Sequence, residues 1–262
     1  MLRALLLTLP LLAFALPASA QGSVLDRIAA SRTLRVCIWP DYFGISYRDA
    51  KTQQLSGIDI DMARALGREL DANVEFVDSS FAHLVEDVVA DRCDIAMFAI
   101  GITPSRQARL RFTRPHLASD IYAITSQGNR RIKAWRDIDR PGTLVAVARG
   151  TLHETVMQDK LQAATLKILD TPHAREQEVE SGRADVFMTD YPFSQRMLKT
   201  TDWARLIKPD RSYHITPYAY AMRPGDDGWH ARVEQFVAGA KRSGLLKAAA
   251  ERHGLTPIVV LD

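Results

Sequence analysis

Residues 92–106 read RCDIAMFAIGITPSR, and this stretch decides the fold class of the chain. Its centre, 95–100, is an apolar run with the length and composition of a buried strand. Thr103 and Pro104 follow at once, and a threonine N-cap with proline in the first turn starts a helix. The stretch therefore predicts a strand that leads directly into a helix, the repeating unit of an α/β fold.

The residues before this stretch continue the alternation of strands and helices. We expect strands over 34–39 and 74–77 and helices over 58–70 and 81–90, where apolar residues recur at helical spacing. Together with the strand over 95–100, these elements predict a βαβαβ unit built on a parallel sheet.

The same plan recurs in the second half of the chain. Strands are expected over 143–148, 165–169 and 186–188, with a helix that starts at Thr151 and another over 174–181. The repeat predicts a second α/β unit.

A short sequence echo connects the two units. RCDIAM at 92–97 and RADVFM at 183–188 each end a predicted helix and enter a predicted strand. Because the two segments stand at the same place in their units, we expect two similar lobes.

The last part of the chain completes the first lobe. A strand over 218–222 and helices over 229–242 and 245–253 are too few for a third domain. The chain then crosses between the lobes near 124–128 and near 215–220, and two lobes on two crossings form a hinge with a cleft. The predicted division gives 21–125 with 219–262 to lobe 1 and 126–218 to lobe 2.

The composition of the 262 residues excludes several classes of protein. Hydrophobic residues make up 47% and charged residues 25%, as in an ordinary globular protein. The 34 basic and 31 acidic residues give a net charge of +3 without a long basic run, so we exclude nucleic acid as a partner. The 7 histidines are scattered and no metal or phosphate motif occurs, so we expect no metal and no cofactor.

The N-terminal segment has the order of a cleavable secretory signal. Arg3 gives a short positive region, 4–16 is apolar, and 17–20 supplies the small residues of a cleavage site after Ala20. The apolar stretch is too short to span a membrane, and the alternative is a buried N-terminal helix. We therefore expect residues 1–20 to be removed and the mature chain to lie in the periplasm.

Cys37 and Cys93 are the two cysteines of the chain, and each lies in or beside a predicted strand. If those strands are neighbours in the sheet, a disulfide is feasible and would stabilise the fold by roughly 4 kcal/mol on the loop-entropy estimate. The alternative is a pair of buried free thiols. No C-x-x-C motif occurs, so we expect no redox role.

Polar and aromatic residues gather at the predicted carboxyl ends of the strands, where ligands of open α/β sheets bind. The candidate ligand-binding residues are Tyr42, Phe81, Gly101 and Arg106 in lobe 1 and Gly150, Thr151 and Asp190 in lobe 2. A guanidinium and a free helix start both attract a carboxylate, and an aspartate pairs with an ammonium. The set predicts a site for a small zwitterion or carboxylate flanked by aromatic faces.

Each candidate also has a purely structural interpretation. Arg106 lies in a basic stretch that fits a solvated helix face, and Asp190 could cap the turn that follows it. Thr151 could act only as an N-cap, with Glu154 completing a capping box. The two aromatic residues could belong to the core.

Four segments in register resemble the bacterial extracellular solute-binding proteins that deliver polar amino acids to ABC transporters. They are LSGIDID at 55–61, GITPSR at 101–106 followed by FTRPH at 112–116, Gly150-Thr151 with Glu154, and GRAD at 182–185 leading to Asp190. The resemblance covers nearly all of the mature chain. It implies the two-lobed periplasmic-binding-protein fold and the capture of a small carboxylate, in most cases an amino acid, by hinge closure for a membrane permease. We expect the chain to be a monomer.

The resemblance also implies roles for single residues. Arg106 matches the arginine that clamps the ligand carboxylate, and Asp190 matches the aspartate that binds its ammonium. Thr151 matches the carboxylate contact of the second lobe, and Tyr42 and Phe81 match the positions that stack on the ligand side chain.

Three positions depart from the family pattern. Gly101 stands where many members carry a hydroxyl residue, Phe98 replaces a small residue, and Leu152 stands where a second threonine is common. These departures predict a less polar pocket and put an ordinary polar amino acid in doubt as the ligand.

Two other functions stay open at this point. The same family contains cyclohexadienyl dehydratases, which need a general acid, supplied there by a glutamate shortly after the second-lobe aspartate. YPFSQ at 191–195 contains none, although His153 or Glu154 could substitute, so we expect no enzyme. The other alternative is a periplasmic accessory protein to a redox enzyme, which an empty ligand cleft would mark.

Overall fold

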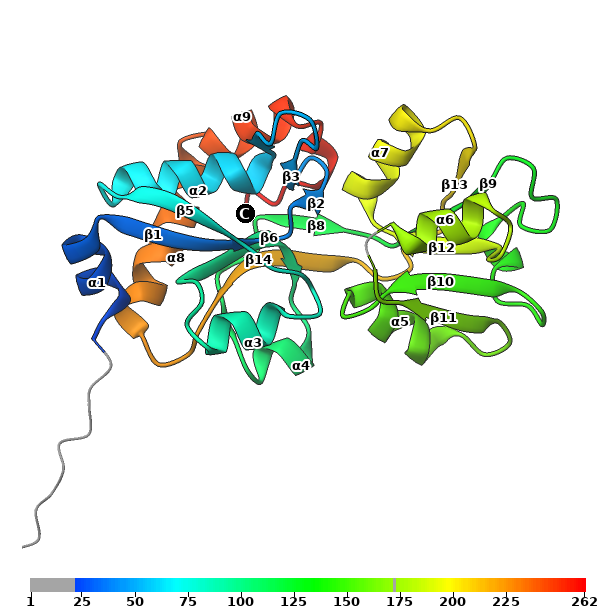
Figure 1. Cartoon of the computed structure of the whole chain (residues 1–262), viewed down its shortest axis with the longest axis horizontal. Helices are drawn as coiled ribbons and strands as arrows, with labels where there is room; N and C mark the ends of the chain where they lie inside the picture. Colours follow the sequence, from blue (N-terminus) through cyan, green and yellow to red (C-terminus); the bar gives the residue numbers. More distant parts are fainter. Residues whose placement is uncertain (1–21, 172) are drawn as a thin grey trace, which may run out of the picture.

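The computed structural model describes residues 22–171 and 173–262, and its strands form two main sheets that lie beside each other along the long axis of the molecule (Figure 1). The strand order is β5-β1-β6-β14-β7 in the first sheet, where β8 also pairs with β14, and β11-β10-β12-β9-β13 in the second. The predicted two-lobed α/β fold is confirmed. The predicted signal segment 1–20 and its cleavage after Ala20 lie outside the described residues.

The strands have the following bounds. The first sheet contains β1 (Thr33–Ile38), β5 (Asn73–Asp78), β6 (Ile95–Gly101), β7 (Arg111–Phe112), β8 (Leu117–Ser119) and β14 (Thr216–Met222). The second contains β9 (Tyr122–Ser126), β10 (Leu144–Ala148), β11 (Thr165–Leu169), β12 (Val186–Thr189) and β13 (Ala204–Ile207). A small third sheet contains β2 (Asp41–Tyr42), β3 (Ser46–Arg48) and β4 (Leu55–Ser56).

Helices cover both faces of each main sheet, with α2 and α9 on one side of the first sheet and α3 and α4 on the other (Figure 1). Their bounds are α1 (Val24–Ser31), α2 (Ile58–Glu69), α3 (Leu84–Val89), α4 (Pro104–Gln107), α5 (Leu152–Lys160), α6 (Ala174–Glu180), α7 (Tyr191–Thr200), α8 (Asp227–Arg242) and α9 (Leu245–Arg252). The predicted helix over 81–90 is shorter than expected, because residues 81–83 form a turn and the helix begins at Leu84.

Both sheets have the same arrangement. Three strands run parallel, and a fourth strand pairs with the edge of this group in the antiparallel direction. β1 is parallel to β5 and β6, and β14 is antiparallel to β6. β10 is likewise parallel to β11 and β12, and β9 is antiparallel to β12.

The aspartate of each echoed segment makes the same pair of hydrogen bonds in its own lobe. Asp94 donates its backbone N–H to the carbonyl of Arg35 at 2.9 Å and accepts the N–H of Arg35 on its carboxylate at 2.7 Å. Asp185 makes the same pair of bonds with Leu144, each at 2.9 Å. The echoed aspartate therefore attaches the start of the third strand to the first strand in each lobe.

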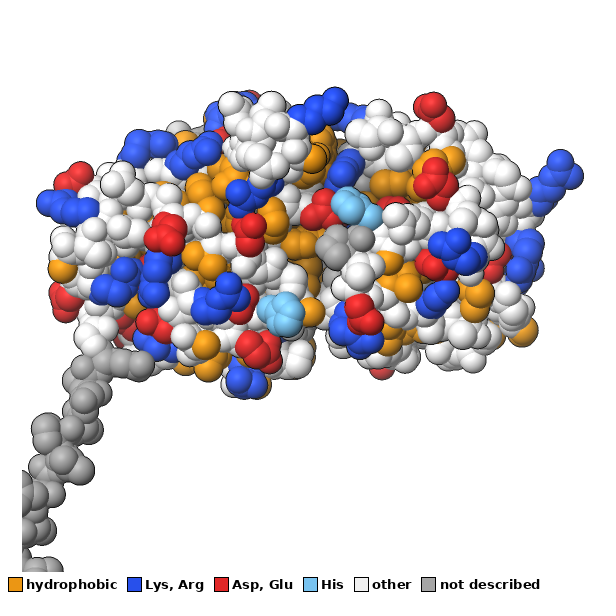
Figure 2. Space-filling model, viewed as in Figure 1, with side chains coloured by type: hydrophobic (Ala, Val, Ile, Leu, Met, Phe, Trp, Pro, Cys, Tyr) orange, Lys and Arg blue, Asp and Glu red, His pale blue; other side chains and the backbone are white. Residues whose placement is uncertain are grey.

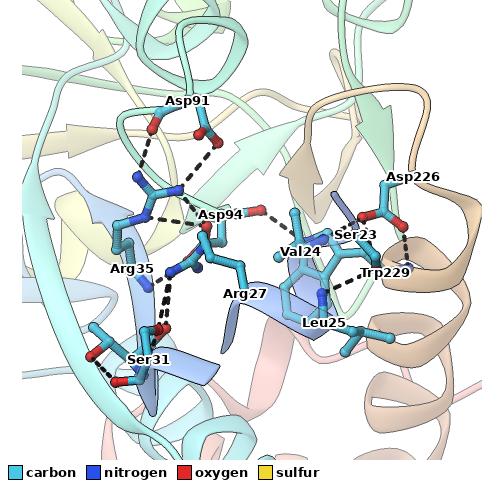
Figure 3. A network of polar contacts seen from close by, with 11 residues as sticks. Ser23, Val24, Leu25, Arg27, Ser31, Arg35, Asp91, Asp94, Asp226 and Trp229 are labelled. Carbon is cyan, nitrogen blue, oxygen red and sulfur yellow. Dashed lines mark hydrogen bonds and ion pairs between the residues drawn. The ribbon is translucent and has the colours of Figure 1, made fainter. Parts of the chain in front are cut away.

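The Asp94 carboxylate also accepts hydrogen bonds from two arginines, as Figure 3 shows. Its side chain is fully buried, and it accepts from the Arg35 guanidinium at 2.7 Å and from Arg27 of α1. The carbonyl of Asp94 accepts the indole N–H of Trp229 at 2.9 Å. One residue thus connects α1, β1 and α8.

Replacing Asp94 with asparagine should lower the free energy of unfolding by about 2 kcal/mol, because hydrogen bonds to a charged partner are lost while the shape is kept. Urea denaturation measures this change. Asp91→Asn is the matched control, since Asp91 also pairs with Arg35 but is 46% exposed, and such pairs contribute about 1 kcal/mol or less. Equal losses in the two variants would contradict the role given to Asp94.

The predicted disulfide is present. Cys37 on β1 is bonded to Cys93, just before β6, with a Cα–Cα distance of 5.6 Å. β1 and β6 are neighbours in the sheet, as the prediction required, and both cysteines are buried.

The two crossings between the sheets lie a few residues earlier than predicted. β9 belongs to the second sheet, so the first crossing is at 120–121 rather than near 124–128. β14 belongs to the first sheet from Thr216 onward, so the second crossing lies within 208–215 rather than 215–220. The apolar pattern identifies each strand but does not tell which sheet it joins.

Asp120 connects the two crossings. Its carboxylate accepts the backbone N–H groups of Ile121 at 2.8 Å, Tyr213 at 2.9 Å and His214 at 2.8 Å. The two chain segments that join the sheets are therefore attached to each other at one point.

Candidate functional site

Two adjoining pockets lie where the carboxyl ends of the parallel strands of both sheets meet. The predicted residues Tyr42, Phe81, Gly101, Arg106, Thr151 and Asp190 line the inner pocket. The outer pocket shares Trp39, Phe81, Thr151 and Arg175 with it. The outer pocket has a cavity volume of about 200 Å³, whereas the inner one, at about 20 Å³, has room for a single water. Side chains from the two lobes fill most of the inner pocket.

Arg106 is the buried cation of the inner pocket. It follows Thr103, whose side chain accepts the N–H of Arg106 and so caps α4 as predicted. Its guanidinium donates to the carbonyl of Gly101 in lobe 1 and to the carbonyl of Gly150 in lobe 2, both at 2.9 Å. Among the described residues no carboxylate lies within 4.0 Å of it, and burial lowers its pKa to about 10, so it stays charged at neutral pH. A solvated helix face is excluded for Arg106, which is 7% exposed.

Gly150 allows the two lobes to approach closely, and Gly101 allows close packing within lobe 1. Gly150 has a φ of +74°, and a Cβ there would lie 2.6 Å from backbone atoms of Ala82. A Cβ on Gly101 would lie 3.1 Å from Thr216. Gly150 does not line the pockets but reaches the site through its carbonyl, which Arg106 contacts.

Thr151 lies at the expected place but does not cap its helix. Its hydroxyl donates to the carbonyl of Ala148 at 2.7 Å, and no side-chain cap bond forms. The capping-box expectation is therefore wrong, because Glu154 accepts the N–H of Gly150 at 2.6 Å instead. Thr151 lines both pockets.

Asp190 is the buried anion of the inner pocket. It caps α7 by accepting the N–H of Phe193 at 3.3 Å, which is the structural role considered for it. Its other carboxylate oxygen accepts the hydroxyls of Tyr42 and Tyr218, the latter at 2.9 Å. Burial raises the pKa of Asp190 against the opposing effect of these hydrogen bonds. Both tyrosines belong to lobe 1, so Asp190 joins the lobes across the cleft.

The predicted aromatic pair packs as part of a cluster. The rings of Tyr42 and Phe81 contact each other edge to face, with centroids 6.0 Å apart, and Trp39 lies 5.3 Å from each of them. The Arg106 guanidinium lies 5.5 Å from the Phe81 ring. In this arrangement the two rings pack on each other rather than as two parallel faces around a gap.

Sequence reasoning named some polar residues of the inner pocket without assigning them to the site and missed others. Thr189 was noted at a strand end and His153 as a possible acid, whereas Arg175 and Tyr218 were not named. Thr189 ends β12, and His153 and Arg175 lie in first turns of helices that follow parallel strands, so the strand-end rule could have assigned all three to the site. Tyr218 lies early in an antiparallel strand, where that rule gives no signal.

The charged residues of the outer pocket are paired with oppositely charged side chains in or beside it. Asp41 lies 3.2 Å from His173 and 3.4 Å from Arg196, and Arg149 contacts Asp170. Arg175 lies 3.6 Å from Glu176. Figure 2 shows that basic and acidic side chains are also interspersed over the visible face of the molecule.

Within residues 22–171 and 173–262, no three His, Cys, Asp or Glu side chains come together in a way that could hold a metal ion. No helix in these ranges is long and apolar enough to span a membrane. The inner pocket itself is lined by two guanidiniums, a carboxylate, an imidazole and several hydroxyl groups.

Comparison with known proteins places the chain among binding proteins and one enzyme. The cyclohexadienyl dehydratase of Pseudomonas aeruginosa is 32% identical over 233 residues, which are 88% of this chain and 86% of the enzyme. The ABC transporter arginine-binding protein 1 of Escherichia coli is 22% identical over 202 residues, 76% of this chain and 82% of that protein.

A solved structure supports the same relationship. A reconstructed ancestral amino-acid-binding protein, described as a precursor of cyclohexadienyl dehydratase, has a TM-score of 0.80 and 30% identity. The match covers 88% of this chain and 99% of that one. The model of the bacterial extracellular solute-binding proteins, family 3, matches residues 34–256, and the chain belongs to this family.

Proposed function

We propose that the chain is the substrate-binding component of an ABC transporter and captures an amino acid or similar small carboxylate between its lobes. The observation that carries the proposal is the Arg106 guanidinium, which is buried in the cleft and bonded only to carbonyl oxygens. A buried cation is stable when an anion pairs with it, and a ligand carboxylate supplies that anion. Asp190 offers a partner for an ammonium on the same ligand.

The proposed mechanism is hinge closure. Arg106 belongs to lobe 1, while Gly150, Thr151 and Asp190 belong to lobe 2, so a ligand contacts all of them only when the lobes are together. The ligand then stabilises the closed state by its differential affinity. We propose lobes that follow the sheets, with residues up to 119 and from 216 onward in lobe 1 and 122–207 in lobe 2, and the segments at Asp120 as the hinge.

The cellular setting belongs to the same proposal. An extracellular solute-binding protein with the N-terminal order of a secretory signal fits export to the periplasm and cleavage after Ala20. There the closed form would meet a membrane permease as a monomer.

A thermal-shift panel on the mature protein tests the proposal. It should contain the common amino acids, small dicarboxylates, prephenate and arogenate. A ligand at 100 times its Kd adds about 2.7 kcal/mol of stability, which for a chain of this size raises Tm by about 5 to 10 °C. The same ligand should reduce the radius of gyration measured by X-ray scattering. No shift with any probe, or binding without a change in radius, contradicts binding by hinge closure.

A second candidate function is a dehydratase, favoured by the 32% identity to cyclohexadienyl dehydratase. The two acids that the sequence offered as substitutes, Glu154 and His153, argue against it. Glu154 is bound to Gly150 N and does not line the inner pocket. Burial lowers the pKa of His153 to about 3, so at neutral pH its imidazole is neutral and too weak an acid to protonate a leaving hydroxyl. Formation of phenylpyruvate from prephenate, followed by absorbance, would establish this activity, and its absence alongside amino-acid binding would exclude it.

A further inference from the structure

Two polar side chains of the inner pocket make no hydrogen bond within the described residues. Neither ring nitrogen of His153 nor the hydroxyl of Thr189 has a partner. Both residues line the inner pocket from lobe 2 and are buried, with exposed fractions of 8% and 1%. Buried polar groups are nearly always hydrogen-bonded, because leaving one unpaired costs free energy. A pair of unpaired groups on one pocket wall therefore points to a ligand.

The neighbouring polar groups of this pocket are already engaged. Arg106 bonds to two carbonyls, and Asp190 accepts two hydroxyls and an N–H. Thr151 bonds to Ala148. His153 and Thr189 are thus the side chains of the inner pocket whose polar atoms lack any hydrogen-bond partner among the described residues, while the Arg106 guanidinium keeps further N–H groups for a carboxylate.

The charges near His153 and Thr189 determine which kind of ligand atom they can bind. Burial, together with the positive charges of Arg175 and Arg106, lowers the pKa of His153 to about 3, against the opposing effect of the nearby Thr189 carbonyl, which does not reach hydrogen-bond geometry with either ring nitrogen. The imidazole is therefore neutral and offers one N–H, and the Thr189 hydroxyl offers a second donor. The two guanidiniums disfavour a second cation here, because Asp190 is assigned to the ammonium of the ligand and Glu176, the carboxylate beside Arg175, lines the outer pocket and not the inner one.

We propose that His153 and Thr189 form a second anchoring point that donates two hydrogen bonds to an oxygen atom of the ligand. The proposal rests on the proposed function, in which Arg106 holds the carboxylate of the same ligand. It assigns the ligand to carboxylates with a further carbonyl, carboxamide, carboxylate or hydroxyl oxygen. Basic and purely apolar side chains are disfavoured.

Binding of matched probes tests this assignment. L-glutamine, L-glutamate and prephenate carry the additional oxygen, L-methionine resembles glutamine in shape without it, and L-lysine carries a cation. At least one oxygen-bearing probe should bind about 10-fold or more tightly than methionine and lysine in calorimetry. If methionine or lysine binds most tightly, the assignment of His153 and Thr189 as an anchoring point is wrong, while the proposed function still stands. The absence of binding by every probe overturns both.

Two variants separate a ligand contact from a structural role. Thr189→Val removes the hydroxyl and keeps the shape, so it should weaken the oxygen-bearing probe about 10-fold, leave methionine unchanged, and leave Tm unchanged or higher. His153→Leu should likewise reduce the preference for the oxygen-bearing probe over methionine. Thr125→Val is the control, because the buried Thr125 hydroxyl donates to the Asp185 carbonyl at 2.7 Å in the same lobe. It should lower Tm and keep the preference; the same pattern in Thr189→Val would overturn the proposal.

Discussion

Replacing Arg106 with methionine should weaken ligand binding by about 100-fold, or about 3 kcal/mol. The guanidinium is 7% exposed, and all of its hydrogen bonds go to carbonyl oxygens of both lobes. A ligand carboxylate that enters this pocket would lose its partner in the variant and stay buried and unpaired. Methionine keeps an unbranched apolar stem, so the variant removes mainly the guanidinium.

Calorimetry with the probe that gives the largest thermal shift measures this loss. Arg109→Met is the matched control, since Arg109 lies one turn away in the same basic stretch but is exposed. The control should bind with unchanged affinity. An Arg106→Met affinity within threefold of the natural chain would show that the carboxylate is held elsewhere.

Removing the Cys37–Cys93 disulfide should have the largest effect on stability. The two cysteines are 56 residues apart in the sequence, and a closed loop of that size reduces the entropy of the unfolded chain enough to stabilise the fold by about 4 kcal/mol. The double variant Cys37→Ala/Cys93→Ala should therefore lose about 10 °C in Tm. Both sites are buried, so alanine avoids placing a polar group in the core.

Ligand affinity distinguishes this effect from damage to the site. Neither cysteine lines the two pockets, so the double variant should bind the ligand normally below its melting temperature. Treating the natural chain with a reductant that opens the bridge should reproduce the loss in Tm. A shift of less than about 2 °C would mean that the unfolded chain gains little freedom when the bridge is absent.

Much of the fold could be predicted from the sequence because its signals are local. The apolar run at 95–100, the Thr103–Pro104 helix start and the same alternation later in the chain each depend on residues close together. The rule that ligands bind at the carboxyl ends of parallel strands then selected Arg106, Thr151 and Asp190, and all three line the inner pocket.

The partners of these side chains depend on contacts between distant segments. Tyr218 reaches Asp190 because β14 returns antiparallel to β6, and no periodicity in the sequence reports which residue of a returning strand faces the cleft. Glu154 bonds to Gly150 and not to Thr151, because the backbone before α5 turns through a glycine with φ of +74°.

The sequence by itself determined the two α/β units and placed the candidate cation and anion at strand ends, since the alternation of elements along the chain and the apolar spacing are properties of neighbouring residues. The disulfide was feasible from the sequence, and the pairing of β1 with β6 decided it. Only the tertiary structure decided where the chain crosses between the sheets and that His153 and Thr189 stand unpaired beside Arg106. Whether a polar group is satisfied depends on every atom packed around it, and those atoms come from both lobes at once.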